Sequence, residues 1–331
     1  MIQRIFSIAR NTFTESIRQP IFMVVLGLGV TLLILELFFA AYTFDNDDKI
    51  LIEFCLSTIF LGGVAMAALI ATGVLSREIE NKTVLTVISK PIGRPAFILG
   101  KYLGVVAAVA LAFWIWSIVF LMLIRHEVMS TASDKVDMPV FYFGFGALAL
   151  AVALATWGNY FYHWVFTSRV VGILAVTITL AYLLVLVINK KWEFQPITTE
   201  FTKETEDGRA VLSQVLIALL LVFEGLMILC AVAIACSTRL GQVLTLLVCL
   251  GIFFVGTFAD WAFGRFEQIQ PLAWVAYRAT PNVGYLFVAD ALSQQAPVTG
   301  GYLAMVSGYA ALYGLAVLCL AVALFQTRET G

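Results

Sequence analysis

The stretch SREIENKTVLTVISKPIGRPAFILGK, residues 76–101, holds five basic and two acidic side chains and lies between two long apolar runs. The rest of the chain is poor in charge. Of its 331 residues, 12% are Asp, Glu, Lys or Arg, and 61% are hydrophobic. A soluble protein of ordinary composition has about 25% charged residues. The composition therefore predicts an integral membrane protein, in which this short charged stretch connects two membrane-spanning helices.

The apolar runs set the expected number of spans. A helix needs about 20 mostly apolar residues to cross a bilayer, and on that criterion the sequence predicts about eight spans. They lie at residues 21–43, 51–75, 102–124, 141–165, 170–188, 211–235, 243–258 and 302–325. We expect an all-α polytopic membrane protein in which residues 1–331 form a single transmembrane domain. Small residues at four-residue spacing, such as Ala147, Ala151 and Ala155, predict close contact between helices.

The residues before the first span predict a helix that lies on the membrane. Between Ile2 and Ile17 apolar side chains recur every three or four positions, and polar side chains occupy the other face. This pattern is typical of an amphipathic helix in the headgroup layer. Pro20 then limits the continuation of that helix. We expect residues 1–20 to form an interfacial elbow helix, and the run that follows is long enough to remain as a span instead of being cleaved as a signal peptide.

The placement of Lys and Arg predicts the orientation. Short cytoplasmic loops carry an excess of these residues. The N-terminal segment and residues 76–101 are both basic, whereas the polar loop at 189–209 carries many of the acidic residues. We therefore expect the N-terminus and the 76–101 loop in the cytoplasm, and the 189–209 loop outside. Eight spans then place the C-terminus in the cytoplasm as well.

Residues 260–301 are too polar to span, yet they are rich in Trp, Tyr and Phe. Aromatic side chains at this density favour the membrane interface. We expect a half-embedded outer segment, with a short helix at 282–293 that begins after Pro281. The alternative is an aromatic belt without a role in substrate handling.

Three acidic residues fall inside the apolar runs: Glu36, Glu53 and Glu224. A charge at the bilayer centre costs about 2.5–3.5 kcal/mol on insertion scales, so such groups usually face protein or water. They are candidates for a polar lining of a conduit or for a proton-sensitive switch. The alternative is an internal hydrogen bond to Ser, Thr or Tyr on a neighbouring span, and for Glu53 a place within reach of the headgroups.

No catalytic or metal-binding pattern is apparent. The cysteines lie in or beside apolar runs without a CxxC pair, and the chain has only two histidines. The sequence GRPAFILGKY has the wrong spacing for a phosphate-binding loop, and Tyr102 stands where that loop needs Ser or Thr. We expect no catalytic residue, no metal and no cofactor on this chain.

The order of residues in the opening stretch resembles a known family. The cytoplasmic loop between the second and third spans of type-2 ABC exporter permeases has an acidic pair, a Thr, a Ser/Lys-Pro-Ile turn, an Arg and a closing Gly-Lys. The family includes the permease of the nitrous-oxide-reductase maturation transporter. The matching residues here are Glu78, Glu80, Thr83, Ser89, Pro91, Ile92, Arg94, Gly100 and Lys101. In that family the loop contains the coupling helix, which inserts into a groove on the nucleotide-binding subunit.

Other parts of the chain are similar to the same family. The elbow helix is one family feature, and the outer segment with Pro281, Asn282 and Asp290 is another. The family commonly has six spans, so the resemblance implies an extra pair at about 141–188, followed by the 189–209 loop. The alternative is that one of the eight predicted spans is re-entrant.

The resemblance implies a permease subunit of an ATP-driven exporter in a prokaryotic cytoplasmic (inner) membrane. The implied partners are a separate ATPase subunit that holds ATP and magnesium, a second permease copy or a related chain, and membrane lipid, but no nucleic acid. The candidate coupling residues are Arg77, Glu78, Glu80, Lys82, Thr83 and Arg94. The substrate stays open, and the competing reading is a channel or scaffold that works without ATP.

Overall fold

The computed structural model describes residues 2–41, 47–76, 93–129, 136–197, 211–265, 271–293, 296 and 298–327. Within these ranges the regular elements are helices, together with an isolated antiparallel bridge between Ile188 and Phe194. The helices are α1 (Ile2–Arg18), α2 (Pro20–Ala40), α3 (Asp47–Ala71), η1 (Thr72–Ser76), α6 (Arg94–His126), α7 (Met138–Tyr162), α8 (Phe166–Val187), α10 (Val211–Ser237), α11 (Gln242–Thr257), η2 (Asp260–Gly264), α12 (Pro271–Ala279), η3 (Val283–Tyr285), α13 (Ala289–Ser293) and α14 (Gly300–Gln326). The expected all-α membrane fold is confirmed.

Seven of these helices are long and apolar enough to cross a membrane, compared with the eight spans that the sequence predicts. The run predicted at 243–258 forms α11, which has only 16 residues. Such a helix is about 24 Å long, less than the roughly 30 Å of the hydrocarbon core. The π-helical turn η2 follows almost directly and continues the chain in the same region. The extra pair predicted at 141–188 is present as α7 and α8.

Local signals in the sequence explain where several helices begin and end. Proline occupies the first turn of α2, α6 and α7, where its missing N–H removes no helical hydrogen bond. Asp137 accepts a hydrogen bond from the backbone N–H of Val140 and caps α7. The same helix ends at His163, which adopts a left-handed conformation with φ 53°. The prolines and Asp137 therefore mark the starts of these helices, and His163 marks the end of α7.

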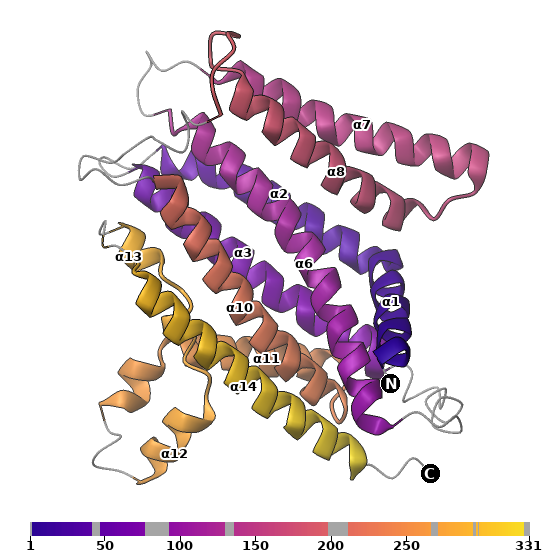
Figure 1. Cartoon of the computed structure of the whole chain (residues 1–331), viewed down its shortest axis with the longest axis vertical. Coiled ribbons are helices and arrows are strands. Elements are labelled where there is room, and N and C mark those ends of the chain that lie inside the picture. Colours follow the sequence, from indigo (N-terminus) through magenta and orange to yellow (C-terminus); the bar gives the residue numbers. More distant parts are fainter. Residues whose placement is uncertain are drawn as a thin grey trace.

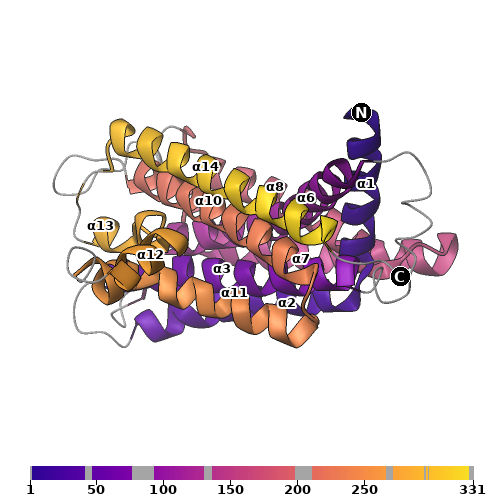
Figure 2. The same cartoon turned by 90° about the horizontal axis from the view of Figure 1, so that it is seen from below.

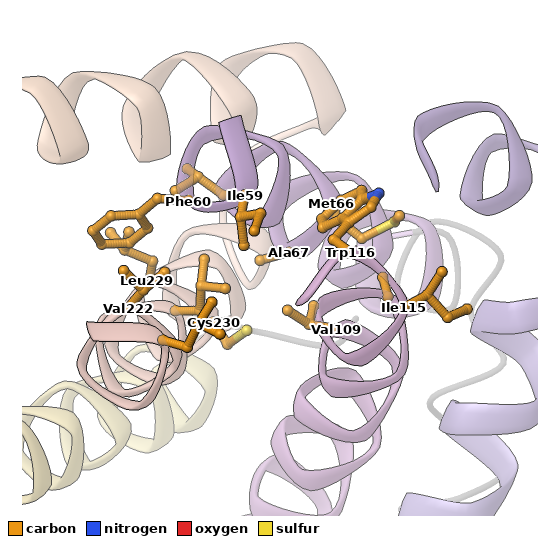
Figure 3. Close-up of a cluster of buried hydrophobic side chains, with 14 of the residues drawn as sticks. Ile59, Phe60, Met66, Ala67, Val109, Ile115, Trp116, Val222, Leu229 and Cys230 are labelled. Atoms are coloured by element: carbon orange, nitrogen blue, oxygen red, sulfur yellow. The ribbon is translucent and has the colours of Figure 1, made fainter. Parts of the chain in front are cut away.

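The core is built by α3, α6 and α10, which are the most buried of the long helices. Figure 3 shows side chains of these three helices meeting around Ala67, Val109 and Leu229. The helices α2, α7 and α14 are the least buried and lie at the periphery. In Figure 1, α7 and α8 run side by side next to α6, away from α10 and α14. The predicted extra pair, α7 and α8, therefore lies at the side of the core formed by α3, α6 and α10.

Several helices meet at one end of the bundle, which we call the junction end. It contains the α1–α2 connection at Gln19, the end of η1 at Ser76, the start of α6 at Arg94 and the end of α14 at Gln326. The Arg94 side chain is hydrogen-bonded to Gln326, and Gly73 of η1 lies against the Gln19 side chain. Figures 1 and 2 both show α1 and the final turns of α14 on the right and α13 on the left.

The segment predicted as one short helix at 282–293 is instead two pieces, η3 and α13. The N–H groups of Leu286 and Phe287 both donate to the carbonyl of Val283, which closes the first piece as a tight turn. The chain then extends through Val288 before α13 begins. The prediction of a single helix was therefore wrong in this detail.

Candidate functional site

The first candidate region is the junction end, because the 76–101 stretch begins and ends there. Ser76 completes η1, Gly93 caps the start of α6, and the residues between them connect two central helices. The candidates Arg77, Glu78, Glu80, Lys82 and Thr83 lie outside the described residues. Arg94 is described: its Nη1 donates a hydrogen bond to the carbonyl of Gln326 at 2.9 Å. Of the six candidate coupling residues, the structure therefore describes Arg94, which lies at the start of α6 and contacts the last turn of α14.

The helix α1 is seated tightly on α6 beside this point. A Cβ on Gly104 would come within 2.7 Å of the Ala9 carbonyl oxygen and 2.5 Å of the Thr12 Cβ, so only glycine allows this approach. Gly100 allows a similar approach to Ile8 one turn earlier. Thr12 is fully buried on the same face, whereas Phe6 is exposed. The α1 helix therefore joins the protein through one face and leaves apolar side chains on another, and its place at the membrane surface stays a prediction.

Glu36 lies in α2 and is buried against α3. The Thr58 hydroxyl donates a hydrogen bond to Glu36 Oε1. Glu36 Oε2 is also buried, and among the described residues no hydrogen-bond partner reaches it. The arrangement matches the alternative in which Glu36 is hydrogen-bonded to a neighbouring span, here through the Thr58 hydroxyl of α3.

Glu224 lies in α10, on the side that faces α14. Ser307 Oγ donates to Glu224 Oε1 at 2.7 Å, and Oε2 is buried with no hydrogen-bond partner among the described residues. Glu224 is less buried than Glu36. Because Glu36 bonds to α3 and Glu224 bonds to α14, the structure does not bring the two carboxyl groups to a shared site. Glu53 is half-buried in α3, two turns from the start of that helix.

The end of the bundle opposite the junction end, which we call the far end, carries a polar cluster. Asp260 Oδ1 accepts hydrogen bonds from Tyr277 Oη at 2.6 Å and from Asn282 Nδ2 at 2.8 Å. Tyr277 Oη also lies 3.0 Å from Tyr285 Oη. The hydrogen bond to Asp260 raises the pKa of Tyr277 above its ordinary value, with smaller contributions from Tyr285 and from burial. Tyr277 therefore stays protonated and holds α12 to η2 and η3.

Of the three predicted outer residues, two are buried in this region and one is exposed. Pro281 and Asn282 are buried, and the backbone N–H of Asn282 donates to Tyr309 Oη at 2.8 Å. Asp290 is exposed in α13. The sequence interpretation missed Asp260 and the three α14 tyrosines. The signals that could have indicated them are an acid directly before the segment rich in aromatic residues, and tyrosines at positions 302, 309 and 313.

A buried ion pair at the far end was also missed. Arg125 Nη1 lies 3.0 Å from Asp137 Oδ2, and both side chains are almost completely buried. A cavity of about 160 Å³ lies beside Arg125 between α3, α6, α8 and α10, with Asp48, Glu127 and Tyr182 among its lining residues. The ion pair joins the last turn of α6 to the start of α7, since Asp137 is also the N-cap of α7. Removing one partner of such a pair leaves an uncompensated buried charge.

The described residues contain no group of three or more His, Cys, Asp or Glu side chains that could hold a metal ion. The cysteines in this part of the chain are free thiols, and Cys55, Cys230 and Cys249 are buried. The polar contacts between the described helices include the Thr58–Glu36 and Ser307–Glu224 hydrogen bonds and the Arg125–Asp137 ion pair.

One family model matches part of the chain. Residues 6–159 match the model of a family described as ABC-2 family transporter protein. The match begins in α1 and extends through α2, α3, the 76–101 stretch and α6 into α7. A search of curated proteins finds no match.

Proposed function

We propose that this chain is the permease subunit of an ATP-driven exporter, because residues 6–159 match the model of a family described as ABC-2 family transporter protein. A separate ATPase subunit holds ATP and magnesium, and a second permease copy or a related chain completes the pathway. The observation that carries the proposal is that the family match includes the 76–101 stretch and the α1 helix beside it. The narrower resemblance to the permease of the nitrous-oxide-reductase maturation transporter is part of the proposal and rests on the residues of that stretch.

The position of the 76–101 stretch supports a role in coupling. It connects η1, at the end of α3, to the start of α6. The helices α3 and α6 are two of the three most buried long helices. A force on a loop between two core helices acts on the centre of the bundle, whereas a force on the α7–α8 turn would act on its periphery. In the proposed mechanism the ATPase binds Arg77, Glu78, Glu80, Lys82 and Thr83, and its closure on ATP moves the start of α6.

The orientation follows from this assignment. The junction end faces the cytoplasm of a prokaryotic cell, so that α1, the coupling stretch and the end of α14 lie on the ATPase side. The far end, with Asp260 and Asn282, faces outward. The arrangement of the described helices supports this proposal, because α1 and the end of α14 share the end at which the coupling stretch begins.

Glu224 is the better candidate of the intramembrane carboxyl groups for the substrate pathway. It is less buried than Glu36, and it bonds to α14, the least buried of the long helices. A peripheral helix can face a second copy or a conduit more readily than a core helix. Glu36 and Glu53 then have supporting roles, Glu36 through its hydrogen bond from Thr58.

The proposal is tested by affinity purification of a tagged chain from its native membrane. We expect an ATPase of the ABC type to co-purify and its ATP hydrolysis to depend on the permease. Glu80→Arg reverses a charge in the coupling stretch, and we expect it to abolish the association. Glu193→Arg makes the same charge change at an exposed site near the far end, and it should leave the association intact.

Retention of the ATPase by the Glu80→Arg chain at the wild-type level would contradict the docking role of this stretch. A purified chain that conducts ions or solutes in vesicles with no ATPase present would favour the alternative, a channel that works without ATP. Purification with only membrane partners would favour a scaffold.

A further inference from the structure

The last turn of α14 is held by arginines from other helices. The final carbonyl groups of a helix have no partner within it, and cations near them are stabilising. The last turn of α14 contains no basic residue of its own. Arg94 of α6 donates to the Gln326 carbonyl at 2.9 Å, and Arg239, in the turn between α10 and α11, donates to the Leu324 carbonyl at 2.9 Å and to Thr327 Oγ1 at 2.6 Å.

An aromatic contact adds to the arginine contact on the α6 side. Phe97 lies one turn after Arg94 and stacks on Phe325, with ring centroids 5.6 Å apart and an interplanar angle of 23°. Both rings are almost fully buried. The start of α6, which is the last part of the 76–101 stretch, therefore contacts the end of α14 through a hydrogen bond and a stacked ring.

The other half of α14 carries the far-end segment. Tyr302 Oη donates to the Tyr285 carbonyl at 2.8 Å, and Tyr313 Oη donates to the Ala279 carbonyl at 2.8 Å. Tyr309 Oη accepts the backbone N–H of Asn282 at 2.8 Å. These tyrosines lie on α14, and their partners lie in or beside α12 and η3, so α14 is fastened to the non-spanning segment by three separate hydrogen bonds.

The inference that follows rests on the proposed function. We propose that α14 transmits movement of the coupling stretch to the far-end segment, and that Arg94 is the positioning residue that attaches the driven end of α14. A helix of 27 residues is about 40 Å long, so it reaches from one end of the bundle to the other. Packed side chains, hydrogen bonds and rigid secondary-structure elements can carry energetic coupling over such a distance. The low burial of α14 allows it to move with less disruption of the core than α3 or α10.

The role of Arg94 in this proposal differs from docking. If Arg94 bound the ATPase, its removal would abolish the association of the ATPase with the chain. If Arg94 instead attaches α14, its removal would leave the association and ATP hydrolysis intact but abolish the movement at the far end. Arg94→Ala therefore separates the two roles, and Arg94→Lys retains one donor and should restore part of the movement. Arg169→Ala is the matched control, because Arg169 lies in the first turn of α8 and packs on the ring of Trp164.

The first measurement uses the purified complex with its ATPase. Spin labels are placed at Val275→Cys in α12 and Leu150→Cys in α7, both exposed, in a chain with Cys319→Ala. Trapping with ATP and vanadate should shift the distance between the labels in the wild-type background and in Arg169→Ala. The shift should be lost in Arg94→Ala, while ATPase association is retained. An equal shift in Arg94→Ala, no shift in the wild type, or loss of association in Arg94→Ala would each overturn the inference.

The second measurement needs no ATPase, so it separates failure of this inference from failure of the proposed function. In the purified chain alone, amide hydrogen exchange is followed at Asn282, whose N–H is bonded to Tyr309. Loss of a simple cap would raise exchange only in the last turn of α14. Transmission along α14 predicts that Arg94→Ala also raises exchange at Asn282 several-fold, whereas Arg169→Ala does not. An unchanged rate at Asn282 would overturn the inference even if no ATPase is ever recovered.

Discussion

Trp116 shows how a single side chain connects three of the spans. Its Nε1 donates to the Leu26 carbonyl at 3.0 Å, and its ring lies where side chains on Gly29 of α2 and Gly62 of α3 would otherwise be. Trp114, two positions earlier in the same helix, is 50% exposed. Both residues occur in one apolar run, so composition alone gives no reason to choose between them. Only the arrangement of the neighbouring helices decides which ring is a core residue.

We predict that Trp116→Ala strongly destabilises the protein. Replacing a fully buried aromatic side chain by Ala costs about 3–5 kcal/mol in soluble cores. The hydrogen bond to Leu26 is lost as well. Thermal unfolding in detergent, followed by fluorescence or by loss of the monodisperse peak, measures the effect. Trp157→Ala removes an exposed ring from α7 and should change the midpoint little; equal effects of the two substitutions would contradict the assignment.

The Ser307–Glu224 hydrogen bond yields a second prediction at this scale. Ser307→Ala removes the hydroxyl that donates to Glu224 Oε1, which leaves a partly buried carboxyl oxygen without this partner. The cost of such a loss is about 1–3 kcal/mol. Ser307→Thr keeps a hydroxyl and should recover most of the stability. The midpoint of thermal unfolding is the measurement, and a Ser307→Ala chain as stable as the wild type would show that this contact does not hold α10 to α14.

At the scale of elements, the sequence predicted which segments are helical better than it predicted how long each helix is. The stripe Ala147, Ala151 and Ala155 indicates a contact face of α7, and the structure buries it, with Thr177 of α8 bonded to the Ala147 carbonyl. The non-spanning segment was harder to predict. Its hydrogen bonds to α14 come from residues more than 15 positions apart, so local pattern could not show that η3 and α13 are separate pieces.

The packing of α1 on α6 gives the prediction for this scale. Gly104→Leu places side-chain atoms where the Ala9 carbonyl and Thr12 lie, so α1 must move away from α6. We expect a large loss of monodisperse protein and faster proteolysis within α1. Gly172→Leu is the matched control, because a Cβ at that position of α8 meets no atom within 4 Å. Normal folding of the Gly104→Leu chain would show that the close approach of α1 is dispensable.

At the scale of the whole molecule, the helices alternate between two ends. The Thr167 hydroxyl at the start of α8 donates to the Arg18 carbonyl, and Arg239 at the end of α10 bonds to the end of α14. Near the far end, Lys190 bonds to Glu127. The short helix α11 also leads away from the Arg239 turn and ends beside Pro281, near the far end. Within the described residues, α2 begins and α14 ends at the junction end, and the short α11 accounts for one of the passages between the two ends. The number of membrane crossings stays a prediction.

Labelling of single cysteines tests this topology in cells. We expect Lys191→Cys, which is exposed near the far end, to react with a membrane-impermeant maleimide added outside. His163→Cys, in the turn between α7 and α8, should react only after the membrane is permeabilised. Lys135→Cys and Glu204→Cys, which lie outside the described residues, are expected to react from outside. Reaction of His163→Cys in intact cells would reverse the proposed orientation.

The sequence by itself determined that this is a helical membrane protein, where its apolar runs lie and which short charged stretch connects two of them. These properties depend on composition and on periodicity along the chain, so they can be read without knowing any distant contact. The tertiary structure decided which carboxyl groups have partners, which tryptophan is buried and that Arg94 reaches the end of α14, 232 positions away. Such contacts depend on which helices become neighbours, and in a chain of uniformly apolar helices many neighbours would satisfy the same local pattern.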